Sequence, residues 1–199
     1  MISKSIMQLD IKLSEAKLSI GIPTFKRDDL LRIALIDLST LNQPGISQDE
    51  REIYTKQYRR LAILGDALFD TVLINYLLDI NSNLTKKEID DWRQEIATRD
   101  SLKEFAIELG LPNFSSSWNN NKRQSPTKEP NLWGEMFEAV IAAIFLDRER
   151  NFLELSQWLC DRFIHPAVAC DVDQKWFEEH YGFADEPGME MHPDNYNLW

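Results

Sequence analysis

The longest apolar stretch of this chain runs from Leu61 to Leu78 and contains only two charged side chains, Asp66 and Asp70. Its length and composition predict one buried helix, from about Tyr58 to Leu78. An ionised carboxylate loses its hydration when it is buried, so it usually pairs with a cation, a metal ion or strong hydrogen-bond donors. The stretch therefore predicts a core helix whose acidic side chains have a partner elsewhere in the protein.

A second apolar stretch, from Trp133 to Leu146, also contains only two charged side chains, Glu135 and Glu138. Their spacing of three residues places both on one face of a helix. If the acidic faces of the two helices meet, the carboxylates form an oxygen-rich site of the kind that binds Mg²⁺. The other interpretation is that these are buried acids satisfied by hydroxyl groups, the backbone or an arginine.

Length and composition indicate an ordinary globular chain. Its 199 residues, 43% of them hydrophobic, suit one domain with a sizeable core. The two cysteines, Cys160 and Cys170, have neither the spacing of a metal site nor that of a disulfide framework. With no signal peptide and no uninterrupted apolar run long enough to span a bilayer, we expect a soluble cytoplasmic protein without a membrane partner.

The net charge of −11 argues against a protein that grips nucleic acid by bulk electrostatics. The charge is uneven, however. From Pro166 to Trp199 there are eight acidic residues and one lysine, whereas the preceding residues are nearly balanced. The body of the protein therefore has enough bases to form a local basic face.

Local sequence signals predict several further helices. Asp28 or Asp29 can cap a helix that reaches Leu38, and a polar segment from Ser47 leads into the long apolar helix. Later helices are expected from capping and stop signals: one opened by Thr85 and Glu88 that runs through Ile96, one capped by Ser101 and ended by Gly110, and one from Asn151 to Phe163.

One long loop is expected from Asn113 to Pro130, directly before the second acidic helix. It contains the bases Lys122, Arg123 and Lys128. Long loops inside compact domains are usually functional or disordered.

Several segments resemble the ribonuclease III family. Residues Leu61 to Leu68 read LAILGDAL, and the usual form of the family's signature helix is ERLEFLGDA. Residues Glu135 to Asp147 read EMFEAVIAAIFLD, and the second family motif is DxFEALIGAIYLD. Asp100 to Leu111 resembles the segment between the motifs, and Leu30 to Ser39 resembles the opening helix. The resemblance covers roughly residues 22–163, in order and at family spacing.

The resemblance implies an all-α endonuclease domain, a helical bundle that works as a homodimer and hydrolyses double-stranded RNA with Mg²⁺, for which Mn²⁺ can substitute. Asp66 and Glu138 match two of the four family carboxylates and are the expected catalytic residues. Together with Glu135, which stands where the family has Asp, they are the expected metal ligands. Asp70 is expected to support the site or lie on the helix surface. Ala62 stands where the family has the first of these four carboxylates, the second Glu of ERLEFLGDA. The compact Mini-III branch also has an apolar residue there and is still an enzyme.

The resemblance also bears on the loop bases Lys122, Arg123 and Lys128. They precede the second acidic helix, where the family has a loop with Lys and Arg, and they are the candidates for contacts with RNA phosphates. Solvated loop charges are the equally open alternative.

Two functions follow from these observations. The first is a Mg²⁺-dependent endoribonuclease acting on double-stranded or structured RNA, such as a ribosomal RNA precursor. The second is a catalytically lapsed ribonuclease III-like module that dimerises or associates with the ribosome. Ala62 and the negative charge favour the module. Retained acids in apolar helices favour the enzyme, because a lapsed site gains stability when buried charge is replaced.

The expected organisation is an N-terminal extension at 1–21, a nuclease domain at 22–165 and an acidic tail at 166–199. The tail is too short and too acidic to be the double-stranded-RNA-binding domain of full-length family members.

Overall fold

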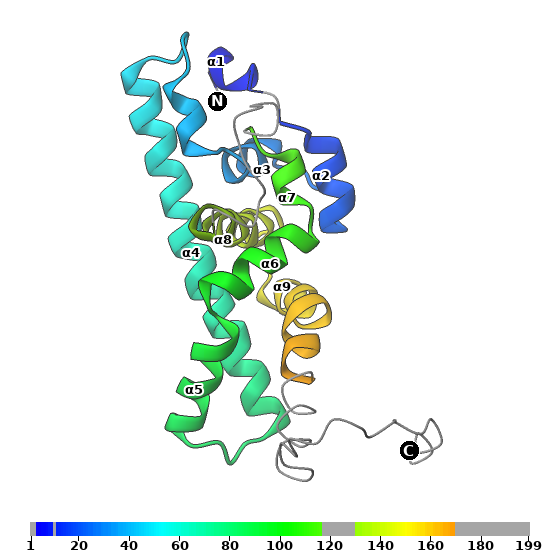
Figure 1. Cartoon of the computed structure of the whole chain (residues 1–199). Helices are drawn as coiled ribbons and strands as arrows, with labels where there is room; N and C mark the ends of the chain where they lie inside the picture. Colours follow the sequence, from blue (N-terminus) through cyan, green and yellow to red (C-terminus); the bar gives the residue numbers. More distant parts are fainter. Residues whose placement is uncertain (1–2, 10, 117–129, 170–199) are drawn as a thin grey trace, which may run out of the picture.

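The computed structural model describes residues 3–9, 11–116 and 130–169, and within these ranges the regular structure is entirely helical. This confirms the expected all-α fold (Figure 1). The elements are, in order, α1 (Lys4–Met7), α2 (Leu13–Ile20), α3 (Asp28–Ala34), the 3₁₀ turn η1 (Leu38–Asn42), α4 (Gln48–Ile80), α5 (Lys86–Ile96), α6 (Arg99–Glu108), α7 (Leu111–Phe114), α8 (Pro130–Asp147), α9 (Phe152–Leu159) and the π-helical segment η3 (Cys160–Ile164).

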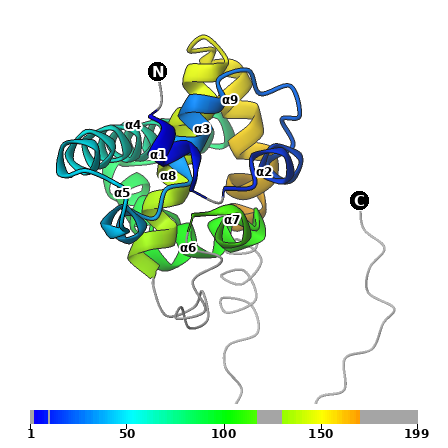
Figure 2. The same cartoon turned by 90° about the horizontal axis from the view of Figure 1, so that it is seen from above.

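Helix α8 forms the centre of the bundle. It contacts α3, α4, α6, α7 and α9, and in the view of Figure 2 the helices α4, α6 and α9 surround it. From Met136 to Ile144 every residue except Glu138 is almost completely buried. A helix that is apolar on all sides can only be stable when other elements cover all of it, which explains its central position.

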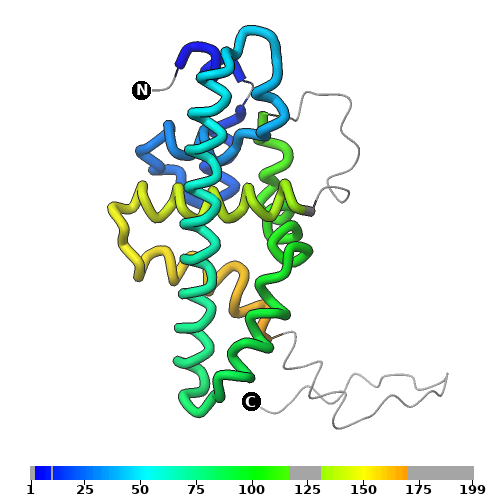
Figure 3. Tube along the Cα trace, turned by 90° about the vertical axis from the view of Figure 1, so that its left-hand side faces the viewer, coloured from blue at the N-terminus to red at the C-terminus, as the bar shows by residue number. Residues whose placement is uncertain are grey.

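Helix α4 runs the length of the molecule and lies across α8 (Figure 3). A capping box formed by Ser47 and Glu50 opens it, and it ends before Asn81. The expectation of one helix that starts polar and becomes apolar is confirmed. The expectation of a buried helix is met on one face of its apolar part only, because Ile63 is 71% exposed and Asp66 is exposed as well.

By length and composition alone, α4 is also apolar enough to cross a membrane. An 18-residue window within it has a mean hydropathy of 1.6. The core helix of a water-soluble protein passes the same test, so this property does not distinguish the two situations.

The capping signals are confirmed for α5 and need correction for α3 and α6. Thr85 and Glu88 form the expected capping box of α5. The cap of α6 is Thr98, not Ser101: the backbone N–H of Ser101 donates to the Thr98 hydroxyl, so Ser101 is the third residue of the helix. Gly110 ends α6 in the left-handed conformation, as expected.

Helix α3 begins without a side-chain cap. Arg27 occupies the cap position, and Asp28 and Asp29 lie in the first turn, where carboxylates interact favourably with the helix dipole. The helix ends at Ala34, before the expected Leu38, which opens η1 instead.

The chain ends of the described region pack on the same core. Ile6, Ala16 and Ile20 of α1 and α2 are buried, so the N-terminal segment is helical and shares the core. The helical backbone after α9 continues to residue 169. The domain boundaries at residues 21 and 165 stay a prediction, and most of the predicted tail, 170–199, lies outside the described residues.

Asp147 at the end of α8 has a structural role. Its side chain is fully buried, and its Oδ1 accepts hydrogen bonds from the backbone N–H groups of Lys26 and Arg27, at 2.8 and 2.7 Å. The last residue of the second motif therefore fixes the end of α8 to the segment that leads into α3.

Candidate active site

Helices α4 and α8 approach each other most closely at Gly65. A Cβ atom at this position would overlap with the backbone carbonyl of Glu138. Only glycine allows this contact between the two backbones. Because Asp66 directly follows Gly65, the crossing places Asp66 beside Glu138.

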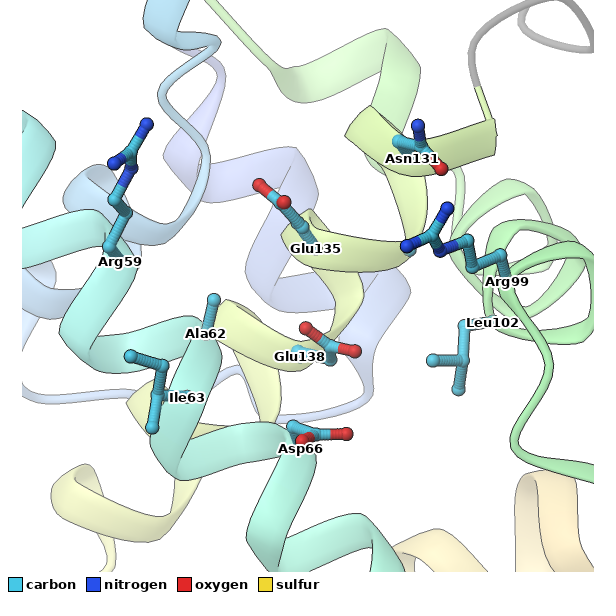
Figure 4. A pocket seen from close by; sticks show the side chains of 10 residues that line it. Arg59, Ala62, Ile63, Asp66, Arg99, Leu102, Asn131, Glu135 and Glu138 are labelled. Atoms are coloured by element: carbon cyan, nitrogen blue, oxygen red, sulfur yellow. The ribbon is translucent and has the colours of Figure 1, made fainter. Parts of the chain in front are cut away.

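The three predicted acidic ligands line one open cavity of about 470 Å³ (Figure 4). Asp66 comes from α4, while Glu135 and Glu138 come from consecutive turns of α8. The acidic faces of the two apolar helices therefore meet, as the sequence predicted. The other lining residues are Arg59, Ala62, Ile63, Arg99, Leu102, Asn131 and Gly134.

The carboxylates repel one another in this cavity. Burial raises the pKa of the Glu138 carboxyl to about 8, and the charges of Asp66, Glu135 and Asp70 add to the rise. Partial burial is the first cause of a raised pKa for Asp66, to which Asp70 also contributes. A cation in the cavity would relieve this repulsion and favour the ionised forms.

The acidic side chains do not form a closed ligand cage. Among the described residues, no three Asp, Glu, His or Cys side chains are arranged to hold a single ion. The donor chemistry, three carboxylates at an open cavity, still suits Mg²⁺, which usually keeps several waters and takes one or two carboxylates directly. The residues present therefore fit a hydrated divalent ion.

Ala62 forms part of the cavity wall one turn before Asp66. Its methyl group offers no oxygen at the position where the family form has Glu. The predicted loss of one ligand is therefore located at the cavity itself.

Asp70 lies outside this cavity and is paired. Its Oδ2 accepts a hydrogen bond from the Arg93 guanidinium of α5, which also contacts Asp90 at 3.6 Å. This agrees with the expectation that Asp70 supports the site. The pairing holds α5 beside α4 next to Asp66, since Asp66, Asp70 and Arg93 border a second hollow.

Sequence reasoning missed three polar residues of the cavity, namely Arg59, Arg99 and Asn131. Arg59 could have been found, because it lies three residues before Ala62 and seven before Asp66, on the same helix face. Arg99 and Asn131 are brought in by the packing of α6 and α8, and no local pattern marks them. The predicted RNA-binding bases Lys122, Arg123 and Lys128 lie outside the described residues.

Comparison with known proteins agrees with the motifs. Residues 59–149 match the Ribonuclease III domain family. The chain is 25% identical over 155 residues to Ribonuclease 3 of Ligilactobacillus salivarius, with 78% of this chain and 62% of the relative covered. It is 30% identical over 150 residues to Ribonuclease 3 of Lactobacillus johnsonii, with 73% and 59% covered. It is 32% identical over 127 residues to Ribonuclease 3 1 of a Nostoc species, with 64% and 53% covered. The chain thus spans between 53% and 62% of the length of these curated relatives.

The fold has a counterpart among solved structures. The nuclease domain of ribonuclease III from Campylobacter jejuni, in a structure that addresses flexibility in a region involved in dimer formation, superposes with a TM-score of 0.59 at 22% identity. The match covers 79% of this chain and 99% of that domain. With the motifs and the fold in agreement, residues 59–149, a little under half of the chain, are identified as a Ribonuclease III domain.

Proposed function

We propose that this protein is an endoribonuclease that hydrolyses phosphodiester bonds of double-stranded or structured RNA with Mg²⁺, or Mn²⁺ in its place. The observation that carries the proposal is the meeting of Asp66, Glu135 and Glu138 from two helices in one open cavity. The match of residues 59–149 to the Ribonuclease III domain family supports an activity on RNA. A ribosomal RNA precursor is one structured substrate to test.

Each acidic residue has a role in this proposal. Asp66 and Glu138 would hold the divalent ion from opposite helices, and Glu135 would hold it directly or through a water. A bound ion of this kind lowers the pKa of its water, orients the phosphate and stabilises charge on the leaving oxygen. In the absence of the ion, Glu138 holds a proton at neutral pH because its pKa is about 8. Ion binding would displace that proton.

The experiment is a cleavage assay on a structured RNA duplex at low salt, with Mg²⁺ and then Mn²⁺. We expect the wild type to cleave and Asp66→Asn and Glu138→Gln to lose at least about a hundredfold in rate, since an ion-holding charge is removed from each. Asp79→Asn is the matched control, because Asp79 is an exposed aspartate of α4 that does not line the cavity. Equal cleavage by wild type and Asp66→Asn would contradict the proposal.

The proposal includes a homodimer that forms through α4. Ile53 and Ile63 are 51% and 71% exposed on this helix. Ile63 borders both the acidic cavity and a shallow hollow along α4, so a second copy of the chain seated on Ile63 would cover apolar surface beside the site. Light scattering should give the mass of a dimer, and Ile63→Asp should shift it toward the monomer. A monomeric wild type would contradict this part.

A second candidate function is a lapsed, dimerising or ribosome-associated module. The observation that favours it is the methyl group of Ala62 in the cavity wall, where the family form has a carboxylate. A dimeric wild type that cleaves none of the RNA duplexes with either ion would favour the module over the enzyme.

A further inference from the structure

Two arginines border the acidic cavity from different helices. Arg59 lies on α4 and Arg99 is the first residue of α6. In Figure 4, Arg99 extends from the α6 side toward the space between Asn131 and Glu138, and Arg59 stands on the α4 side. Glu135 lies between the two arginines in this view. Cationic side chains therefore flank the carboxylates.

Both guanidinium groups are free among the described residues. Neither Arg59 nor Arg99 makes an ion pair or hydrogen bond with another described side chain or backbone group, and both residues are exposed. Other arginines of the fold do pair: Arg93 binds Asp70, and Arg148 lies 3.1 Å from Glu154. The packing of the bundle therefore does not explain why two arginines stand at this cavity.

The two arginines offset most of the negative charge of the cavity. Three carboxylates and two guanidinium groups line it, so its formal charge is −1 when all five are ionised. A site that must approach an anionic phosphate while carrying acidic side chains needs local cations, because the net charge of the whole protein, −11, repels an anion. Arginine suits this task because its planar guanidinium can donate two parallel hydrogen bonds to one phosphate.

Helix α4 lacks an acidic residue at two positions where the family form has one, and both differences remove a negative charge. The family form ERLEFLGDA has Glu where this chain has Arg59 and Ala62, one helical turn apart. Both departures make the cavity less acidic. The loss of the carboxylate at Ala62 thus accompanies the gain of a cation at Arg59.

We propose that Arg59 and Arg99 bind phosphates of the RNA strand on either side of the carboxylates, as a clamp built by α4 and α6. This inference rests on the proposed function, because it names the groups that hold the RNA at that same site. Arg59 binds from the α4 side and Arg99 from the α6 side. Both are positioning residues, since they act on the backbone of the substrate and leave the metal-binding acids unchanged.

The test compares Arg59→Gln, Arg99→Gln and the double variant with Arg150→Gln. Arg150 is an exposed arginine beyond the far end of α8, a helix about 27 Å long, so it provides the same change in charge away from the cavity. Binding to a fluorescent RNA duplex is measured by anisotropy with a chelator present and over a series of salt concentrations. A melting temperature for each variant reports whether it is folded.

We expect each clamp variant to bind the duplex about three- to tenfold more weakly than the wild type. The slope of log affinity against log salt should fall by about 0.9 for each phosphate contact removed. In the double variant this slope should fall by about twice as much as in either single variant. Arg150→Gln should have the affinity and the slope of the wild type. Arg99→Lys should recover the slope of the wild type but only part of the affinity, since lysine keeps the charge and loses the bidentate geometry.

Clamp variants that bind like Arg150→Gln and change only the melting temperature would overturn the clamp, because the arginines would then only balance the acids. In that case RNA cleavage by the wild type would leave the proposed function standing. A wild type that binds the duplex through the arginines without cleaving it would support the clamp and overturn the nuclease activity. A wild type that binds no duplex would overturn both.

Discussion

Helices α4 and α8 look alike in sequence but differ in their surroundings. Each is an apolar stretch with two acidic residues. The apolar side chains of α8 from Met136 to Ile144 are buried against α3, α4, α6, α7 and α9, whereas α4 leaves Ile63 71% exposed. The difference shows that an apolar helix pattern reports how much surface must be covered but not what covers it. For α8 the bundle itself is the cover. On α4, the described residues of the same chain leave the Ile63 side chain exposed, which is why we propose that a second copy packs there.

The largest expected effect is a difference in the stability lost when an apolar residue of each helix is replaced by alanine. Phe137 of α8 is fully buried among Phe69, Phe105 and Phe163, so Phe137→Ala should lower the free energy of unfolding by about 3–5 kcal/mol. Ile63→Ala on α4 should change it by less than about 0.5 kcal/mol at a protein concentration low enough for monomers. Urea unfolding of both variants measures this. Similar losses for the two would contradict the contrast in burial.

The second effect concerns the crossing of the two helices. Gly65→Ala places a methyl group against the backbone of α8 and should cost about 1–3 kcal/mol, together with most of the cleavage activity. Gly134→Ala is the matched control on α8, because its new Cβ would lie 3.5 Å from the Leu102 side chain, an ordinary contact. This change should be neutral or stabilising by up to about 1 kcal/mol. A Gly65→Ala protein as stable as the Gly134→Ala protein would show that the helices can separate at little cost.

The third effect is a dependence of stability on pH. The pKa of Glu138 in the folded protein, about 8, is above its usual value of 4.5, so the folded state holds this proton more tightly than the unfolded state. As pH rises from about 4.5 to 8, the unfolded state ionises first and the free energy of unfolding falls. Asp66, whose pKa is also raised, acts in the same direction.

Urea unfolding at pH 5 and pH 8 with a chelator present measures this fall. Glu138→Gln should remove most of it, and Glu149→Gln, an exposed glutamate beyond the far end of α8, should leave it unchanged. If Glu138→Gln loses as much stability as the wild type between pH 5 and pH 8, the fall must come from other titrating groups.

The smallest expected effect restores the family form at the cavity wall. Ala62→Glu adds a carboxylate one turn before Asp66 and should lower the Mg²⁺ concentration needed for half-maximal cleavage about three- to tenfold. Ala67→Glu, at an exposed position of α4 that does not line the cavity, is the control. An unchanged Mg²⁺ requirement for Ala62→Glu would mean that this position does not reach the ion.

Structural features that depend on residues a few positions apart, such as helix caps, could be predicted from the sequence. The capping box that opens α5 involves residues three apart, Thr85 and Glu88, and it is predicted correctly. The capping box of Ser47 and Glu50 at α4 has the same spacing, but only a polar start of the helix is predicted there. The same kind of signal failed at α6 because Thr98 and Ser101 are both good caps, and the hydroxyl of Thr98 bonds to the backbone of Ser101. Local patterns could not choose between them.

Features that depend on distant packing were only partly predictable. The meeting of Asp66 with Glu135 and Glu138 could be inferred because two apolar helices with acidic faces have few ways to satisfy them. The role of Gly65 as the contact point, and the arrival of Arg99 at the cavity, depend on where α8 and α6 cross the long helix. That crossing is set by the packing of the whole bundle.

The central claim is that α4 and α8 together form a divalent-cation site on the folded protein. Its most direct test is the melting temperature in chelator and in millimolar Mg²⁺ or Mn²⁺, for the wild type, Asp66→Asn and Asp79→Asn. An ion that binds only the folded state must raise the melting temperature. We predict a rise for the wild type and Asp79→Asn, and a much smaller one for Asp66→Asn. The same response in all three proteins, or none in the wild type, would contradict the claim.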